Sequence, residues 1–232
     1  MSWIHRVLGK DGATQLAVDA NFAARMSARP MPLGARGSYG ISLFTGILPA
    51  ALAANSEIFQ FRFVDASGRL VLIRSIVVSA CVSTTFFAAG VPVQLEARIA
   101  RSWSAQGTLG TGITFGANDS KKRTNHGTSL LAAGDVRIAT TAALGVGTKT
   151  LDGTAFAALA APGPITASLN GQIIAPGTYL WQRNSNDEYP VILANQEGFV
   201  VRSVAVPGTG TWMASVSVEW AEIDPAVVDG WA

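Results

Sequence analysis

The sequence predicts an all-β protein, an antiparallel β-sandwich with a jelly-roll-like topology, an extended N-terminal arm and long loops. Segments 57–64 and 211–221 alternate apolar and polar residues with the period of two that a half-buried strand shows. About eight short segments of this kind follow one another along the chain, as in a sandwich. The 24 glycines and 10 prolines are spread among them, as many turns require.

The first clear strand is Glu57 to Val64, where one face carries three phenylalanines: Phe59, Phe61 and Phe63. The segment Val64 to Arg69 contains Asp, Ser and Gly, so we expect a hairpin loop there. The next strand, Arg69 to Val82, is apolar on both faces, which is typical of a central strand. Single helical turns are predicted at Ala50 to Asn55, after Pro49, and at Ala155 to Ala160.

Two further long strands are predicted from the same alternation. In Val91 to Trp103 the inner face consists of Val93, Leu95, Ala97 and Ile99. In Thr211 to Ala221 the inner face consists of Trp212, Ala214, Val216, Val218 and Trp220, and the opposite face, which we expect to be wet, of Ser215, Ser217 and Glu219. Shorter strands complete the set: Asp135 to Ala139, Gly177 to Arg183, Val191 to Ala194 and Gly198 to Val206.

Two regions depart from the strand pattern. Residues 1–38 mix apolar residues with arginines and contain Pro30-Met31-Pro32, which predicts an extended arm that lies on another surface. Residues 39–232 are predicted to form a single β-sandwich domain. Within that domain, residues 104–152 are rich in Gly, Thr and Ala, so we expect long loops that are functional or held by a partner.

The composition excludes several classes of function. The net charge of +2 is too small for a nucleic-acid-binding protein, and no span is long and apolar enough to cross a bilayer. Residues 1–12 show no secretion signal, so we expect the protein to be made and kept in the cytoplasm, or released only by lysis. The single cysteine, Cys81, lies in an apolar run and is predicted to be a buried, inert thiol.

The search for chemistry predicts neither an enzyme nor a cofactor site. His126, Ser129 and Asp135 form a possible Ser-His-Asp set, but no nucleophile elbow surrounds Ser129, so a polar surface loop is the preferred interpretation. Oxygen ligands for calcium stand at Asn184, Asn186, Asp187 and Glu188, where turn-forming side chains are the simpler explanation.

Candidate interface residues follow from charge and from the terminal tryptophans. Only 14% of the residues are charged, against about 25% in an average soluble protein, which favours a surface buried against other subunits. We expect interface residues in the arm and the basic loop, and a tryptophan near each terminus: Arg25, Arg29 and Arg36; Lys121, Lys122 and Arg123; Trp3 and Trp231. The acidic complement would be Glu219, Glu222, Asp224 and Asp229, which could join copies of the chain.

Three stretches resemble structural proteins of tailed bacteriophages. They are Glu197 to Arg202 followed by Pro207 to Trp212 and Val216 to Trp220; Lys122 to Leu130 followed by Asp135 to Ile138 and Thr140 to Leu144; and Gly40 to Phe63. They cover most of the chain after about residue 38 and contain no catalytic motif. The resemblance implies a virion component, such as a capsid decoration or cement protein or another minor capsid or tail component.

Two functions are carried forward. The first is a non-enzymatic virion structural protein that forms homo-oligomers, with a trimer as one candidate, and binds the particle surface through major capsid or tail proteins, where repeated contacts give avidity. The second is a receptor- or carbohydrate-binding module of a tail appendage, because jelly rolls also serve as lectins. Its candidate residues are Trp181, Asn184, Asn186, Asp187 and Tyr189.

Overall fold

The computed structural model describes residues 37–49, 52–85, 87, 92–161, 173–183, 190–205 and 208–224. The chain divides into two units, residues 1–32 and 33–232, and every described residue belongs to the second. The predicted N-terminal arm therefore lies outside the described residues, apart from Gly37 and Ser38, which already belong to the first strand.

The described residues form β-strands and no helix, in agreement with the predicted all-β class. The strands in chain order are β1 (Gly37–Phe44), β2 (Leu48–Pro49), β3 (Ser56–Phe63), β4 (Leu70–Val82), β5 (Val93–Ala105), β6 (Thr111–Gly112), β7 (Val136–Ile138), β8 (Thr148–Leu151), β9 (Ala157–Ala161), β10 (Ile173–Gln182), β11 (Ile192–Leu193), β12 (Glu197–Ala205) and β13 (Thr211–Ile223). The strands predicted from alternation all occur, with ends that differ by a few residues.

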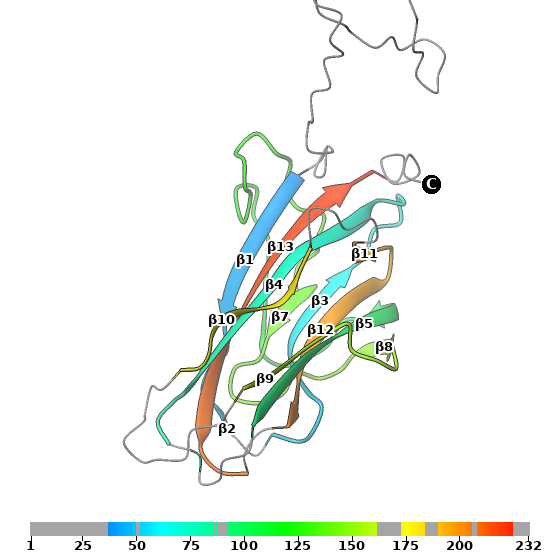
Figure 1. The fold of residues 1–232 in the computed structure, drawn as a ribbon. Helices are drawn as coiled ribbons and strands as arrows, with labels where there is room; N and C mark the ends of the chain where they lie inside the picture. The colour runs from blue at the N-terminus through cyan, green and yellow to red at the C-terminus, as the bar shows by residue number, and fades with distance from the viewer. Residues whose placement is uncertain are drawn as a thin grey trace, which may run out of the picture. The chain divides into compact units, whose positions relative to one another are not determined.

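The strands form two antiparallel sheets that pack against each other (Figure 1). The first sheet has the order β1-β13-β4-β10, and the second contains β3-β12-β5, with β9 beside β5. With these eight strands numbered along the chain, the orders are first-eighth-third-sixth and second-seventh-fourth-fifth. This is the strand order of a jelly roll, which confirms the predicted fold class. As expected, β4 is a central strand, between β13 and β10.

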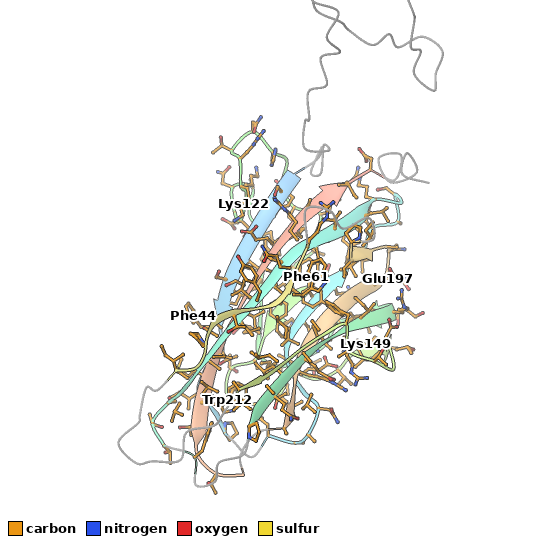
Figure 2. All side chains as sticks on the ribbon, viewed as in Figure 1. Phe44, Phe61, Lys122, Lys149, Glu197 and Trp212 are labelled. Carbon is orange, nitrogen blue, oxygen red and sulfur yellow. The ribbon has the colours of Figure 1, made fainter. Side chains whose placement is uncertain are left out.

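A cluster of aromatic rings joins the two sheets. Trp220 of β13 stacks on Tyr39 of β1, with ring centroids 5.5 Å apart. The same indole meets Phe61 of β3 edge-on at 5.4 Å, and Phe61 stacks on Phe199 of β12 at 5.2 Å. These rings are almost completely buried. Because Trp220 and Phe61 belong to different sheets, their contact holds the sandwich together across its central layer. Figure 2 labels Phe61.

Two local predictions are wrong. The loop 64–69 is a turn braced by Asp65, but it joins β3 to β4, which lie in different sheets, so it is no hairpin loop. The helical turn predicted at 155–160 is replaced by β9, because pairing with β5 satisfies its backbone groups. The described part of the other predicted turn, residues 52–55, is coil and turn.

Two parts of the long segment 104–152, around Gly107 and from Gly145 to Leu151, lie over the outer face of the second sheet. Beneath them lies a small second core of Ala100, Trp103 and Val200, against which Leu151 packs. Hydrogen bonds fix the segment to the sheet: the Gln60 amide donates to the Gly145 carbonyl, and the Arg62 guanidinium donates to the Ser104 carbonyl. The sandwich thus uses its own loops to cover part of one of its two outer faces.

Replacing Phe61 by alanine should lower the free energy of unfolding by about 3–5 kcal/mol, because it empties a fully buried position between the sheets. The matched control is Phe44→Ala at a phenylalanine that is 73% exposed, where we expect a change within about 0.5 kcal/mol. Denaturant unfolding of both variants measures the difference. Equal losses in the two variants would contradict the assigned core.

Candidate interaction surface

The outward side of the first sheet carries three cross-strand rows of uncharged side chains. Strand register places Ile173, Cys81 and Met213 in one row, and Ser79, Ser215 and Phe44 in the next. The third row consists of Tyr179, Val77, Ser217 and Ser42. On β13 these residues alternate with the buried Trp212, Ala214, Val216 and Val218, so they point away from the core. We call these ten residues the uncharged face.

The serines of the uncharged face bond to one another across the strands. The Ser42 and Ser217 hydroxyl oxygens lie 2.7 Å apart, and the Ser79 and Ser215 oxygens 2.6 Å apart. Each pair thus contains a hydrogen bond that does not depend on water. A partner surface can cover these hydroxyls at lower cost than it could cover polar groups bonded to water alone.

A groove of about 390 Å³ lies on this face between Phe44 and β10. Its lining includes Cys81 and Met213 of the central strands and Ile173 and Pro176 of β10. Cys81 is half-buried and lines the groove, so the prediction of a buried thiol is wrong. The prediction failed because the apolar run around Cys81 belongs to a strand with apolar residues on both faces.

Large apolar side chains stand exposed around the groove. Phe44 is 73% exposed, Ile173 61% and Tyr179 56%. Figure 2 shows Phe44 at the end of β1, on the side of the sandwich away from Lys149. Sequence analysis did not identify these residues, and it assigned Ser215 and Ser217 to a wet face. The sequence does not reveal the pairing register of the strands, and it is this register that places uncharged residues of four strands side by side.

The uncharged face ends where charged residues begin. One row beyond Ser217, Glu219 forms an ion pair with Lys122 at 2.6 Å. The loop that carries Lys122 also covers the adjoining edge of β1, because the Gly40 amide donates to Ser120 and the Lys122 amide donates to Ser38. At the other edge of the sheet, register shifts interrupt the pairing of β10 with β4 around Pro176 and Gly177.

The possible Ser-His-Asp set is not assembled. His126 Nδ1 accepts a hydrogen bond from the Ser38 amide, and the Ser129 hydroxyl donates to Glu222. Asp135 pairs with Arg62 at 2.8 Å. Each of the three side chains therefore serves a different contact. The expected polar surface loop is found only in part, because Ser129 and Asp135 are buried.

The predicted interface residues are described only in part. Lys121, Lys122 and Arg123 lie in the loop beside β1, where Lys122 is held by Glu219 of the same chain. A contact between copies through Lys122 would have to compete with this pair. The other members of the set lie outside the described residues: Trp3, Arg25, Arg29, Arg36 and Trp231.

The loop predicted as a calcium or glycan site also falls outside the described residues, since positions 184–189 are not described. Trp181, the described member of the glycan set, is half-buried and packs edge-on against Phe156 at 6.3 Å. Within the described ranges no three His, Cys, Asp or Glu side chains gather as metal ligands. No helix among the described residues is long and apolar enough to span a membrane.

A buried ion pair fastens segment 104–152 to the second sheet. Lys149 Nζ lies 2.9 Å from Glu57 Oε2, and both side chains are 2% exposed. The ammonium also lies 4.3 Å from the centre of the Trp103 ring, as in a cation–π contact. Burial lowers the pKa of Lys149, and the hydrogen bond and charge of Glu57 oppose this shift.

Glu222 holds the middle of the same segment. Its carboxylate accepts hydrogen bonds from the Ser129 hydroxyl at 2.6 Å and from the Leu130 amide at 3.0 Å. Burial raises the pKa of Glu222, although these hydrogen bonds favour the charged form. Burial, together with the negative charge of Glu222, raises the pKa of Tyr39 to about 12. The Lys149–Glu57 pair and the hydrogen bonds of Glu222 therefore both attach segment 104–152 to the sheets.

Comparison of the chain with models of protein families, with curated proteins and with solved protein structures finds no significant match in any of the three.

Lys149→Met should lower the free energy of unfolding by about 3–5 kcal/mol, because it leaves the Glu57 carboxylate buried without its cation. The double variant Glu57→Leu/Lys149→Met should lose less, because neither charge then remains buried alone. Denaturant unfolding of both single variants and the double variant measures the coupling. Additive losses would show that the two side chains do not interact.

Glu222 should make stability fall as the pH rises. Its pKa is raised in the folded state, so its contribution is fully present below about pH 4.5 and is lost as the pH rises through the folded-state pKa. Glu222→Gln should remove this slope, and Glu219→Gln controls for the loss of a carboxylate on the same strand. Unfolding free energies measured from pH 4 to 8 test the sign. An unchanged slope in Glu222→Gln would exclude Glu222 as its source.

Proposed function

We propose that the chain is a non-enzymatic structural protein of a virion, a capsid decoration or cement protein or another minor capsid or tail component, and that its uncharged face is a protein contact. The observation that carries the proposal is the uncharged face itself. Three adjacent rows without a charge, with Phe44, Ile173 and Tyr179 exposed among them, form a contiguous surface with much apolar area. Such surfaces on soluble proteins mark interaction sites.

The contrast between the two outer faces supports the same function. Part of the outer face of the second sheet is covered by the residues around Gly107 and from Gly145 to Leu151, with a small core beneath them. On the first sheet, no described segment covers the corresponding side chains, and Phe44 remains 73% exposed. Covering the face with a partner removes this apolar surface from water, at about 25 cal/mol per Å². Contacts of modest strength suffice when they repeat around a particle.

The charged groups most deeply placed in the fold have structural partners. Lys149 is paired with Glu57, Arg62 with Asp135, and Glu222 with Ser129 and Leu130. These contacts fix segment 104–152 and the loop around residue 130 to the sheets. A rigid sandwich with one open sheet face suits a subunit that acts by fitting against its neighbours.

Incorporation into particles tests the proposal. Phe44→Asp places a charge on the uncharged face and should reduce the amount of the chain in purified virions by at least tenfold, in an assembly reaction or in infected cells that supply the variant. Leu109→Asp is the control, because Leu109 is 62% exposed in segment 104–152, away from this face. It should be incorporated normally.

Two outcomes would contradict the proposal. The first is absence of the wild-type chain from purified particles. The second is specific binding of host-surface glycans by the isolated chain, with no change in Phe44→Asp, which would favour the receptor- or carbohydrate-binding function.

A further inference from the structure

We propose that Lys149 and Gln60 become joined after the chain has folded, through an amide bond between Lys149 Nζ and Gln60 Cδ, with Glu57 as the group that transfers the protons. The three side chains meet in a buried pocket on the outer face of the second sheet. The inference concerns a covalent modification within one chain and does not depend on the proposed function.

A β-bulge in β3 brings Glu57 and Gln60 to the same face of the sheet. In a regular strand, positions 57 and 60 would point to opposite faces. The pairing of β3 with β12 shifts register between Phe59 and Glu57, and Ile58 and Phe59 are both buried in the main core. The bulge therefore turns Glu57 outward, beside Gln60, whose Nε2 donates to Glu57 Oε2 at 2.5 Å. Bulges often re-aim a side chain next to an active site.

Lys149 reaches the same carboxylate oxygen from β8. Its Nζ lies 2.9 Å from Glu57 Oε2, the atom that also accepts the hydrogen bond of Gln60. The amine and the amide are thus held together on one oxygen. The reaction requires only that Nζ leave this oxygen and move to Cδ, the carbon bonded to Nε2. Groups that are well aligned in this way react as if at about 10⁵–10⁸ M.

The pocket excludes water and favours uncharged groups. The side chains of Lys149 and Glu57 are 2% exposed and Gln60 is 1% exposed, and the Trp103 ring lies 4.3 Å from Nζ. The backbone of Gly107 closes the pocket over Gln60, since a Cβ at Gly107 would stand 2.1 Å from Gln60 Oε1. Burial lowers the pKa of Lys149, against the opposing effect of Glu57, and so favours the neutral amine that acts as a nucleophile.

The Gln60 carbonyl oxygen is a separate indication of a reactive group. Gln60 Oε1 is buried and has no hydrogen-bond partner among the described residues. Its amide uses only the NH₂ end, toward Glu57 and the Gly145 carbonyl. Buried polar atoms without a partner are rare in folded proteins, and a catalytic role is one reason for keeping one.

The reaction releases one molecule of ammonia and needs no further reactant. Glu57 takes a proton from the Lys149 ammonium, and the neutral amine attacks Gln60 Cδ. In the tetrahedral intermediate, Glu57 gives its proton to Nε2 and takes another from Nζ. The Cδ–Nε2 bond breaks, Nε2 leaves as ammonia, and the Nζ–Cδ amide remains beside a protonated Glu57. The product replaces a buried ion pair by uncharged groups, which lowers the cost of burial.

The bond would fasten segment 104–152 permanently to β3. It joins Gln60 to Lys149 on β8 and closes a long loop of chain, which restricts the unfolded state as a disulfide does. Unlike a disulfide, an amide bond is not broken by reducing agents.

Intact-mass measurement of the full-length chain tests the bond. The purified folded chain is kept at physiological temperature until its mass stops changing, and is then unfolded for the measurement. The wild-type chain should be lighter than its sequence requires by the mass of one ammonia molecule. Trypsin should release a branched peptide that joins residues 37–62 to residues 138–183, because a modified Lys149 is not cleaved.

Variants identify the role of each group. Lys149→Arg keeps the cation and Gln60→Met keeps the size of the side chain, and both should show neither the mass loss nor the branched peptide. Glu57→Gln should slow the reaction by at least about 100-fold. Lys122→Arg is the matched control and should react like the wild type, because Lys122 is also paired with a glutamate but is exposed.

Four results would overturn the inference. An unchanged wild-type mass would leave Lys149 and Glu57 as a buried ion pair. Loss of water in place of ammonia would make Glu57 the group that bonds to Lys149. Loss of ammonia that persists in Lys149→Arg would place the reaction at another amide, and an undiminished rate in Glu57→Gln would exclude Glu57 from the proton transfers. The wild-type mass and branched peptide decide whether the bond exists even if a variant fails to fold.

Discussion

The contact between Trp220 and Phe61 is the interaction on which the rest of the structure depends. It joins β13 of the first sheet to β3 of the second, with ring centroids 5.4 Å apart in a layer closed to water. When the inner faces of the two sheets are buried against each other, every second side chain of each strand points outward, because side chains alternate along a strand. The sandwich then has two outer faces. Loops of the chain lie over one of them, the other is open within the described residues, and this difference leads to the functional proposal.

The chain covers part of one outer face itself and leaves the other open within the described residues. Over the second sheet, segment 104–152 adds a small core around Trp103 and a buried ion pair between Lys149 and Glu57. Over the first sheet, the loop around Lys122 protects only one end of β1. The open region consists of serines that bond to each other and of exposed apolar side chains, a composition suited to a partner surface.

Much of the fold could be predicted from the sequence, because alternation reports burial directly. The phenylalanines of β3 and the tryptophans of β13 were assigned to the core correctly. The β1 strand was missed, since Gly37 to Phe44 carries glycine and serine in place of large alternating residues, and its pairing with β13 overrides weak local propensity. The passage of the chain from one sheet to the other after residue 64 was missed too. Turn-forming residues indicate that the chain reverses, but they do not specify which sheet the next strand joins.

The interaction surface was harder to predict than the fold. Its residues come from four strands that are distant in sequence, and only the register of β1, β13, β4 and β10 aligns them. The low content of charged residues indicated that part of the surface is uncharged, but the sequence could not show which strands carry that surface.

The most direct measurement is hydroxyl-radical footprinting of assembled particles and of the isolated chain at low concentration. Met213 and Phe44 on the uncharged face should be labelled in the isolated chain and protected in particles, while the exposed Leu109 and Val146 serve as references. Equal labelling of Met213 and Phe44 in both samples would contradict the claim that this face is a protein contact.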